Sequence, residues 1–401
     1  MTRTTSQRSR QWTGPAVFSF GFRPFFLFGA VWAAMAMLAW VFMLTGAVAL
    51  PTLFDPVSWH AHEFLFGYLG AIIAGFLLTA VPNWTGRLPV VGWQLAALFT
   101  LWVAGRVAIA SSAILPLGWA AGIDLAFPIA LAGVLLREII AGKNWRNLVV
   151  LFLLLAFALA NLLFHIDATQ GKSAAHGIGL RCGVAAVLMM IAVIGGRVIP
   201  SFTRNWLVRQ KSDRLPVPPM QRFDRAALLL TGLALGFWVV APDHVATGFG
   251  LLGIGVLHGL RLLRWQGLQS LSEPLLWILH IGYAFVPLGA VLAGAAVLWP
   301  DVVPAIAAQH LWMAGAFGVM TMAMMTRATL GHTGQSLHAG RGTVFIYLSL
   351  IGSITARIAA AIWVGSAMAF YVVSGVLWIS AFLSFAVIYG PCLMKPKPVP
   401  A

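Results

Sequence analysis

Long apolar runs recur from one end of this chain to the other, and they constrain its fold more than any other feature. The sequence has 401 residues, of which 60% are hydrophobic and only 9% are charged. A hydrocarbon layer about 30 Å thick is crossed by roughly 20 apolar helical residues, and only helices and closed barrels satisfy every backbone hydrogen bond inside it. The pattern therefore predicts an all-α polytopic membrane helix bundle in a lipid bilayer.

The sequence predicts twelve transmembrane helices. They lie near residues 24–46, 58–81, 90–112, 117–139, 145–165, 175–199, 224–241, 245–265, 273–298, 304–327, 343–364 and 368–390. Because most connections are too short to fold alone, residues 1–401 are predicted to form a single integral membrane domain. One long cytoplasmic loop divides it into two six-helix halves, 1–200 and 224–401.

The basic residues predict the orientation of the spans. The formal net charge is +15, and most Lys and Arg side chains fall in alternate loops, which the positive-inside rule assigns to the cytoplasm. These residues are Arg3, Arg8, Arg10, Arg87, Lys143, Arg146, Arg204, Arg209, Lys211, Arg214, Arg222, Arg225, Arg261, Arg264, Arg341, Lys395 and Lys397. Both termini are therefore predicted to be cytoplasmic. Since topology explains the charge, no nucleic-acid partner is expected.

Histidines and one glutamate gather near the outer ends of several predicted spans. His60, His62 and Glu63 open the second span, His165 ends the fifth, and His310 lies near the start of the tenth. Ionisable groups are costly in hydrocarbon and mark functional sites by default, and imidazole is the commonest protein metal ligand. We therefore expect an outer metal site that uses His60, His62 and His310, with His165 and Glu63 close by.

Residue spacing limits how these side chains can share a site. His60 and His62 are two residues apart, so a regular helix points them about 200° away from each other. They are expected to serve two neighbouring sites, or one as a ligand and the other as a relay. His60 and Glu63 are three residues apart and share a helix face.

A second pair of histidines lies deeper in the chain. His258 and His280 are at matched distances from the turn that joins the eighth and ninth spans. Adjacent antiparallel helices would bring them face to face, where they would ligate a second metal centre. For any single histidine, the alternative interpretation is a hydrogen-bonded core residue.

Three arginines lie in the outer halves of predicted spans, namely Arg106, Arg181 and Arg357. The only acids at comparable depth are Glu63 and Asp124. A bound anion would balance the remaining positive charge. The alternative is that these side chains snorkel to the interface or pair with backbone carbonyls.

Five longer blocks of sequence form recognisable motifs. They are Gly21–Phe26 (GFRPFF), Trp59–Glu63 (WHAHE), Ala74–Gly86 (AGFLLTAVPNWTG), Gly196–Asn205 (GRVIPSFTRN) and Met325–Gly334 (MTRATLGHTG). With these blocks the chain resembles the NnrS family. The resemblance implies a bacterial inner-membrane protein that contains haem and copper and is linked to nitric oxide stress and often to denitrification.

Taken with the resemblance, the residues predict a haem–copper oxidoreductase that acts on nitric oxide or a nitrosylated product and takes electrons from an unidentified donor. Histidine ligation suits both metals. Glu63 would move protons as the catalytic acid–base group, while Arg106, Arg181 and Arg357 would pair with haem propionates. No Cys-x-x-Cys-His motif is present, so the haem is expected to be non-covalent and b-type.

Two other functions remain open. A secondary transporter of a metal ion or small anion is compatible with twelve spans, with intramembrane arginines and with a helix break at Val81-Pro82. A haem-based nitric oxide sensor without turnover is also compatible with the same residues. Haem in the purified protein would exclude the transporter, and catalytic loss of nitric oxide would exclude the sensor.

Overall fold

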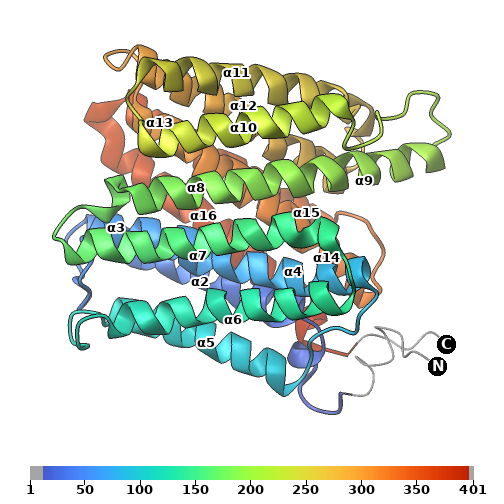
Figure 1. Ribbon diagram of the computed structural model, residues 1–401, viewed down its shortest axis with the longest axis horizontal. Helices are drawn as coiled ribbons and strands as arrows, with labels where there is room; N and C mark the ends of the chain where they lie inside the picture. The colour runs from blue at the N-terminus through green and yellow to red at the C-terminus, as the bar shows by residue number, and fades with distance from the viewer. Residues whose placement is uncertain (1–11, 397–401) are drawn as a thin grey trace. The chain divides into compact units, whose positions relative to one another are not determined.

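The computed structural model describes residues 12–396, and within that range it contains helices and no strand (Figure 1). Eleven helices of this range are long and apolar enough to cross a membrane. The predicted all-α polytopic bundle is therefore confirmed. Four of the basic residues used to predict orientation, Arg3, Arg8, Arg10 and Lys397, lie outside the described residues.

The helices follow the predicted spans closely. In chain order they are α2 (Phe22–Leu44), α3 (Pro56–His62), η2 (Glu63–Tyr68), α4 (Leu69–Thr85), α5 (Trp93–Ala110), α6 (Trp119–Ala141), α7 (Leu148–Thr169), α8 (Ile178–Met190), η5 (Ile191–Gly195), α9 (Gly196–Arg209), α10 (Arg222–Val240), α11 (Val245–Leu263), α12 (Pro274–Leu298), α13 (Ala305–His310), η7 (Leu311–Val319), α14 (Met320–Thr333), α15 (Arg341–Ile362) and α16 (Ala367–Met394).

The predicted span near 304–327 is helical but is not among the eleven apolar helices. It is a continuous helical run from Ala305 to Thr333, made of α13, η7 and α14. Gln309, His310 and Thr321 make this run more polar than its neighbours. Of these three residues, His310 is the one that the sequence analysis had named as a functional candidate.

The helix break considered at Val81-Pro82 is absent. Helix α4 continues through Pro82 to Thr85 and ends at Gly86, which has a positive φ of 68°. A glycine adopts this left-handed conformation without a steric penalty and commonly terminates a helix. The interpretation of Pro82 as a break was wrong, and the transporter hypothesis loses that support.

Three of the long helical runs in the described part of the chain contain a π-helical segment. The first, η2, begins directly after His62, and the longest, η7, begins directly after His310. The third, η5, joins α8 to α9. A π-helical turn holds more residues than an α-helical turn and recurs at functional sites. The side chains around His62 and His310 therefore take directions that a regular helix would not give them.

The chain forms two compact units that are interleaved in sequence. Unit 1 comprises Met1–Gly183, Ala328–Ser336 and Phe382–Ala401, and unit 2 comprises Val184–Arg327 and Leu337–Ala381. Helices α8, α14 and α16 each contribute residues to both units. The division into halves 1–200 and 224–401 stays a prediction.

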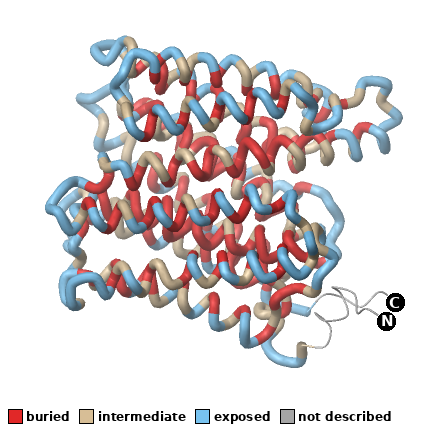
Figure 2. Tube along the Cα trace, viewed as in Figure 1, coloured by how far each residue is buried: buried red, intermediate tan, exposed pale blue. Residues whose placement is uncertain are grey.

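Within unit 1, α5, α6 and α7 lie side by side in chain order, and α4 packs against α2 and α6 (Figure 1). Exposed and buried positions alternate along each of these helices (Figure 2). Large apolar side chains occupy the exposed positions, including Val107, Ile129 and Phe152. A surface of this composition suits contact with lipid rather than water, while the buried faces enclose polar side chains.

The GFRPFF block has a structural explanation. Arg23, which is 3% exposed, donates from Nη1 to the backbone carbonyls of Cys392, Leu393 and Lys395 at 3.2, 2.9 and 2.6 Å. These carbonyls lie at the C-terminal end of α16, where a cation also interacts favourably with the helix dipole. Arg23 thereby ties the start of the first span to the end of the last one.

Candidate metal centre

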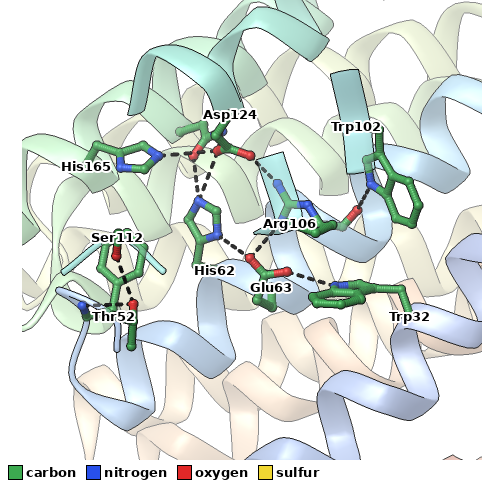
Figure 3. Close-up of polar contacts among 12 residues, drawn as sticks. Trp32, Thr52, His62, Glu63, Trp102, Arg106, Ser112, Asp124 and His165 are labelled. Atoms are coloured by element: carbon green, nitrogen blue, oxygen red, sulfur yellow. Dashed lines mark hydrogen bonds and ion pairs between the residues drawn. The ribbon is translucent and has the colours of Figure 1, made fainter. Parts of the chain in front are cut away.

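Buried polar side chains from four membrane-spanning helical runs of unit 1 meet at one place (Figure 3). Each is less than a tenth exposed, although all lie on membrane-spanning helical runs. They are His62 at the end of α3, Glu63 at the start of η2, Arg106 on α5, Asp124 on α6, and Asn161 and His165 on α7. We call this set the buried polar cluster.

Two histidines and one aspartate of the cluster are arranged as a candidate metal site. Asp124 Oδ2 lies 3.3 Å from Nε2 of His62 and 3.3 Å from Nε2 of His165. The three ligand atoms all lie within 4.8 Å of one another. Imidazole nitrogen and carboxylate oxygen are a donor set that suits copper, zinc and non-haem iron.

Glu63 orients the His62 ring. Its Oε1 lies 3.0 Å from Nδ1 of His62, and its Oε2 accepts a 2.8 Å hydrogen bond from Nε1 of Trp32. A carboxylate that accepts the second N–H of a histidine fixes the ring and leaves the other nitrogen for a metal. Here that other nitrogen is Nε2, which faces Asp124.

Arg106 neutralises part of the negative charge of the cluster. It donates from Nη1 to Glu63 at 2.6 Å and from Nη2 to Asp124. Two carboxylates and one guanidinium leave one excess negative charge when both histidines are neutral. Because an uncompensated buried charge is expensive, the cluster requires one more cation, which is either a proton on His62 or a metal ion.

Asn161 was not among the residues predicted from the sequence, and Asp124 was expected only to pair with an arginine. Asn161 donates from Nδ2 to Asp124 Oδ2 at 2.7 Å, and its Oδ1 lies 3.0 Å from Nε2 of His62. Two features of the sequence could have identified these residues. Asp124 is a charged residue inside an apolar run, and Asn161 lies four residues before His165, on the same helix face.

His60 lies outside the cluster, although the prediction grouped it with His62. Its ring stacks on Trp40 with the centroids 4.5 Å apart. The two-residue spacing had already predicted different directions for His60 and His62. Glu63 bonds to His62, its neighbour in sequence.

His310 belongs to unit 2, and its ring is oriented by its own helix. Its Nδ1 donates to the backbone carbonyl of Ile306 at 2.8 Å, which leaves Nε2 as the nitrogen with a lone pair. A ring held in this way is the usual arrangement of a metal-ligating histidine. The prediction that His310 shares a site with His60 and His62 stays a prediction.

His258 and His280 are both buried in unit 2, but they contact different partners. His258 Nδ1 lies 2.7 Å from the hydroxyl of Tyr283, and its Nε2 lies 2.8 Å from that of Thr231. His280 Nε2 lies 2.9 Å from the hydroxyl of Thr203. Since both nitrogens of His258 have protein partners, this geometry favours the core-residue alternative for His258. Their role as ligands of a second centre stays a prediction.

The three predicted anion-binding arginines differ in their surroundings. Arg106 is paired with Glu63 and Asp124, so the geometry does not support a propionate role for it. Arg181 donates to the backbone carbonyl of His176 at 2.8 Å. Arg357 stacks on Tyr371 at 4.8 Å, and its buried Nη1 has no hydrogen-bond partner among the described residues. Arg357 therefore keeps the capacity to bind an anion.

Gly67 lets Arg106 and Glu63 approach the helix. A Cβ atom at this position would lie 2.8 Å from Glu63 Oε2 and would clash with Nη1 of Arg106. We therefore expect Gly67→Ala to lower the free energy of unfolding by about 1–3 kcal/mol through overpacking. Thermal unfolding in detergent measures the effect. Gly133→Ala is the matched control, because no atom lies within 4 Å of its Cβ position. An equal response of the two variants would contradict the prediction.

The fold and the buried polar cluster define a multi-pass helical membrane protein with a candidate metal centre in unit 1. The chain belongs to the NnrS family, because the family model described as "NnrS protein" matches residues 16–397, nearly its whole length. This match confirms the resemblance that the sequence blocks indicated. No curated protein matches the sequence.

Proposed function

We propose that this protein binds copper and haem in the bacterial inner membrane and carries out redox chemistry on nitric oxide or a nitrosylated species. The observation that carries the proposal is the convergence of His62, Asp124 and His165 in the interior of unit 1, with Glu63 behind His62. Membership of the NnrS family supports the link to nitric oxide, through the resemblance described above.

The residues of the cluster fit a copper ion. The donor set of two imidazoles and one carboxylate is compatible with Cu(II), and the excess negative charge of the cluster favours a cation. Bound copper would supply one-electron chemistry beside an apolar interior. Glu63 would hold the His62 ring, Arg106 would position the two carboxylates through its ion pairs with them, and Asn161 would fix Asp124.

Unit 2 offers residues that fit a haem. His310 presents Nε2 because its Nδ1 is bonded to Ile306. Helix α13, which ends at His310, packs against α15, which carries Arg357. The guanidinium of Arg357, whose buried Nη1 has no hydrogen-bond partner among the described residues, would pair with a propionate. Bound haem would supply nitric oxide binding and one-electron transfer.

One experiment on the purified protein separates the three candidate functions. Metal analysis and an optical spectrum are recorded, followed by the rate of nitric oxide loss under anaerobic conditions with a chemical reductant. We expect copper, haem and a catalytic rate. Both metals without turnover would support the sensor, and the absence of both metals would support the transporter.

A further inference from the structure

A small cavity adjoins the buried polar cluster in unit 1. Its volume is about 10 Å³, which is space for one water-sized molecule. One side is apolar and aromatic, and the other side is polar and shared with the cluster. The lining includes Phe66, Phe127, Phe157, Arg106, Asp124 and Asn161.

Arg106 lines this cavity and also has an unused hydrogen-bond donor. Two of its three nitrogens donate to Glu63 and Asp124. The third, Nε, is buried and has no hydrogen-bond partner among the described residues, and the whole residue is only 4% exposed. Because an unpaired buried N–H is costly, a ligand that accepts one hydrogen bond would be stabilised here.

The surroundings restrict the chemistry of such a ligand. An anion would add to the excess negative charge of the cluster, and the one cation that the cluster requires is already assigned to His62 or to the metal ion held by His62, Asp124 and His165. The ligand is therefore uncharged, contains one or two heavy atoms, and carries a hydrogen-bond acceptor at one end. The phenyl rings favour a molecule whose other end is apolar.

We propose that this cavity is a docking site for a neutral diatomic oxide, nitric oxide, whose acceptor end is hydrogen-bonded to Nε of Arg106. The site lies next to Asp124, so it holds the substrate beside the candidate metal centre. The choice of nitric oxide over water rests on the proposed function. The choice of a small neutral acceptor rests only on the cavity and on Arg106.

Gly70 provides a way to fill the cavity without disturbing the cluster. A Cβ atom there would lie 3.9 Å from Phe127 and 4.0 Å from Phe157, which is ordinary contact. Gly70→Ala therefore adds a methyl group between two rings that line the cavity. Gly133→Ala makes the same change where no neighbour lies within 4 Å, and it is the matched control.

High-resolution structures of the full-length protein prepared under argon and under nitric oxide test the proposal. We expect density for one small molecule at Arg106 Nε under nitric oxide only, in the wild type and in Gly133→Ala, but not in Gly70→Ala. The same density under argon would identify water and overturn the gas assignment. An empty cavity under both gases, or density unchanged by Gly70→Ala, would also overturn it.

Kinetics distinguish a failure of this proposal from a failure of the proposed function. If the wild type consumes nitric oxide, Gly70→Ala should lower the rate at low nitric oxide by roughly tenfold with unchanged metal content, and Gly133→Ala should not. Consumption that is equal in all three proteins would overturn the docking site alone. If the wild type consumes none, the proposed function fails, while the structures still decide what the cavity binds.

Discussion

Replacing Arg106 with leucine is expected to lower the free energy of unfolding by about 3–5 kcal/mol, the range for breaking a buried ion pair by removing one partner. The substitution leaves Glu63 and Asp124 buried at 0% and 2% exposure without their shared cation. Thermal unfolding of the protein in detergent measures the loss. The additional change Glu63→Gln should recover part of it, because it removes one of the two orphaned charges.

Arg137 provides the matched control for Arg106. It also pairs with a carboxylate, Glu138, at 2.8 Å, but its side chain is 54% exposed. Exposed ion pairs contribute about 0–1 kcal/mol, so Arg137→Leu should cost little. Similar losses for the two arginine variants would contradict the account of Arg106 as the cation that the cluster requires.

Replacing His62 or His165 with alanine is expected to abolish copper binding, since each change removes one of three candidate ligands. Glu63→Gln should weaken copper binding by about 10–100-fold, the range for removing an outer-shell partner of a metal-ligating histidine. The measurement is the copper-to-protein ratio after equilibration with a defined free copper concentration. His338→Ala is the control, because His338 lies exposed in a loop.

Two outcomes of that series would count against the metal centre. Full copper content in both His62→Ala and His165→Ala would show that copper binds elsewhere. An equal loss in His338→Ala would show that the treatment, rather than the ligand, removes the metal.

The fold was predictable from the sequence because the bilayer allows few alternatives. Apolar runs of about 20 residues predict helices, and the structure contains them. The depth of side chains along the membrane normal also follows from span order. Span order predicts that His62, Glu63 and His165 lie at one depth, and in the structure all three belong to the buried polar cluster.

The direction in which each side chain projects around its helix axis was not predictable from the sequence. Glu63 bonds to its neighbour His62 and to Trp32, although residue spacing had grouped Glu63 with His60. The pairing of Arg106 with both carboxylates depends on Gly67, whose missing side chain lets the guanidinium approach. Neither effect is visible in hydropathy or in residue spacing.

His258 illustrates a different limit. Its depth matched that of His280, and this suggested a shared site. The structure gives His258 two hydroxyl partners, Thr231 and Tyr283, contributed by α10 and α12, and the shared site stays a prediction. Hydroxyl residues are common in apolar helices, so sequence alone could not distinguish a hydrogen-bonded histidine from a ligand.

The central claim is that His62, Asp124 and His165 hold a metal ion in unit 1. Anomalous scattering recorded at the copper absorption edge, from crystals of the purified full-length protein, tests this claim most directly. The account predicts a copper peak within coordination distance of Nε2 of His62, Nε2 of His165 and a carboxylate oxygen of Asp124. A copper peak elsewhere in the protein, with none between these three residues, would contradict it.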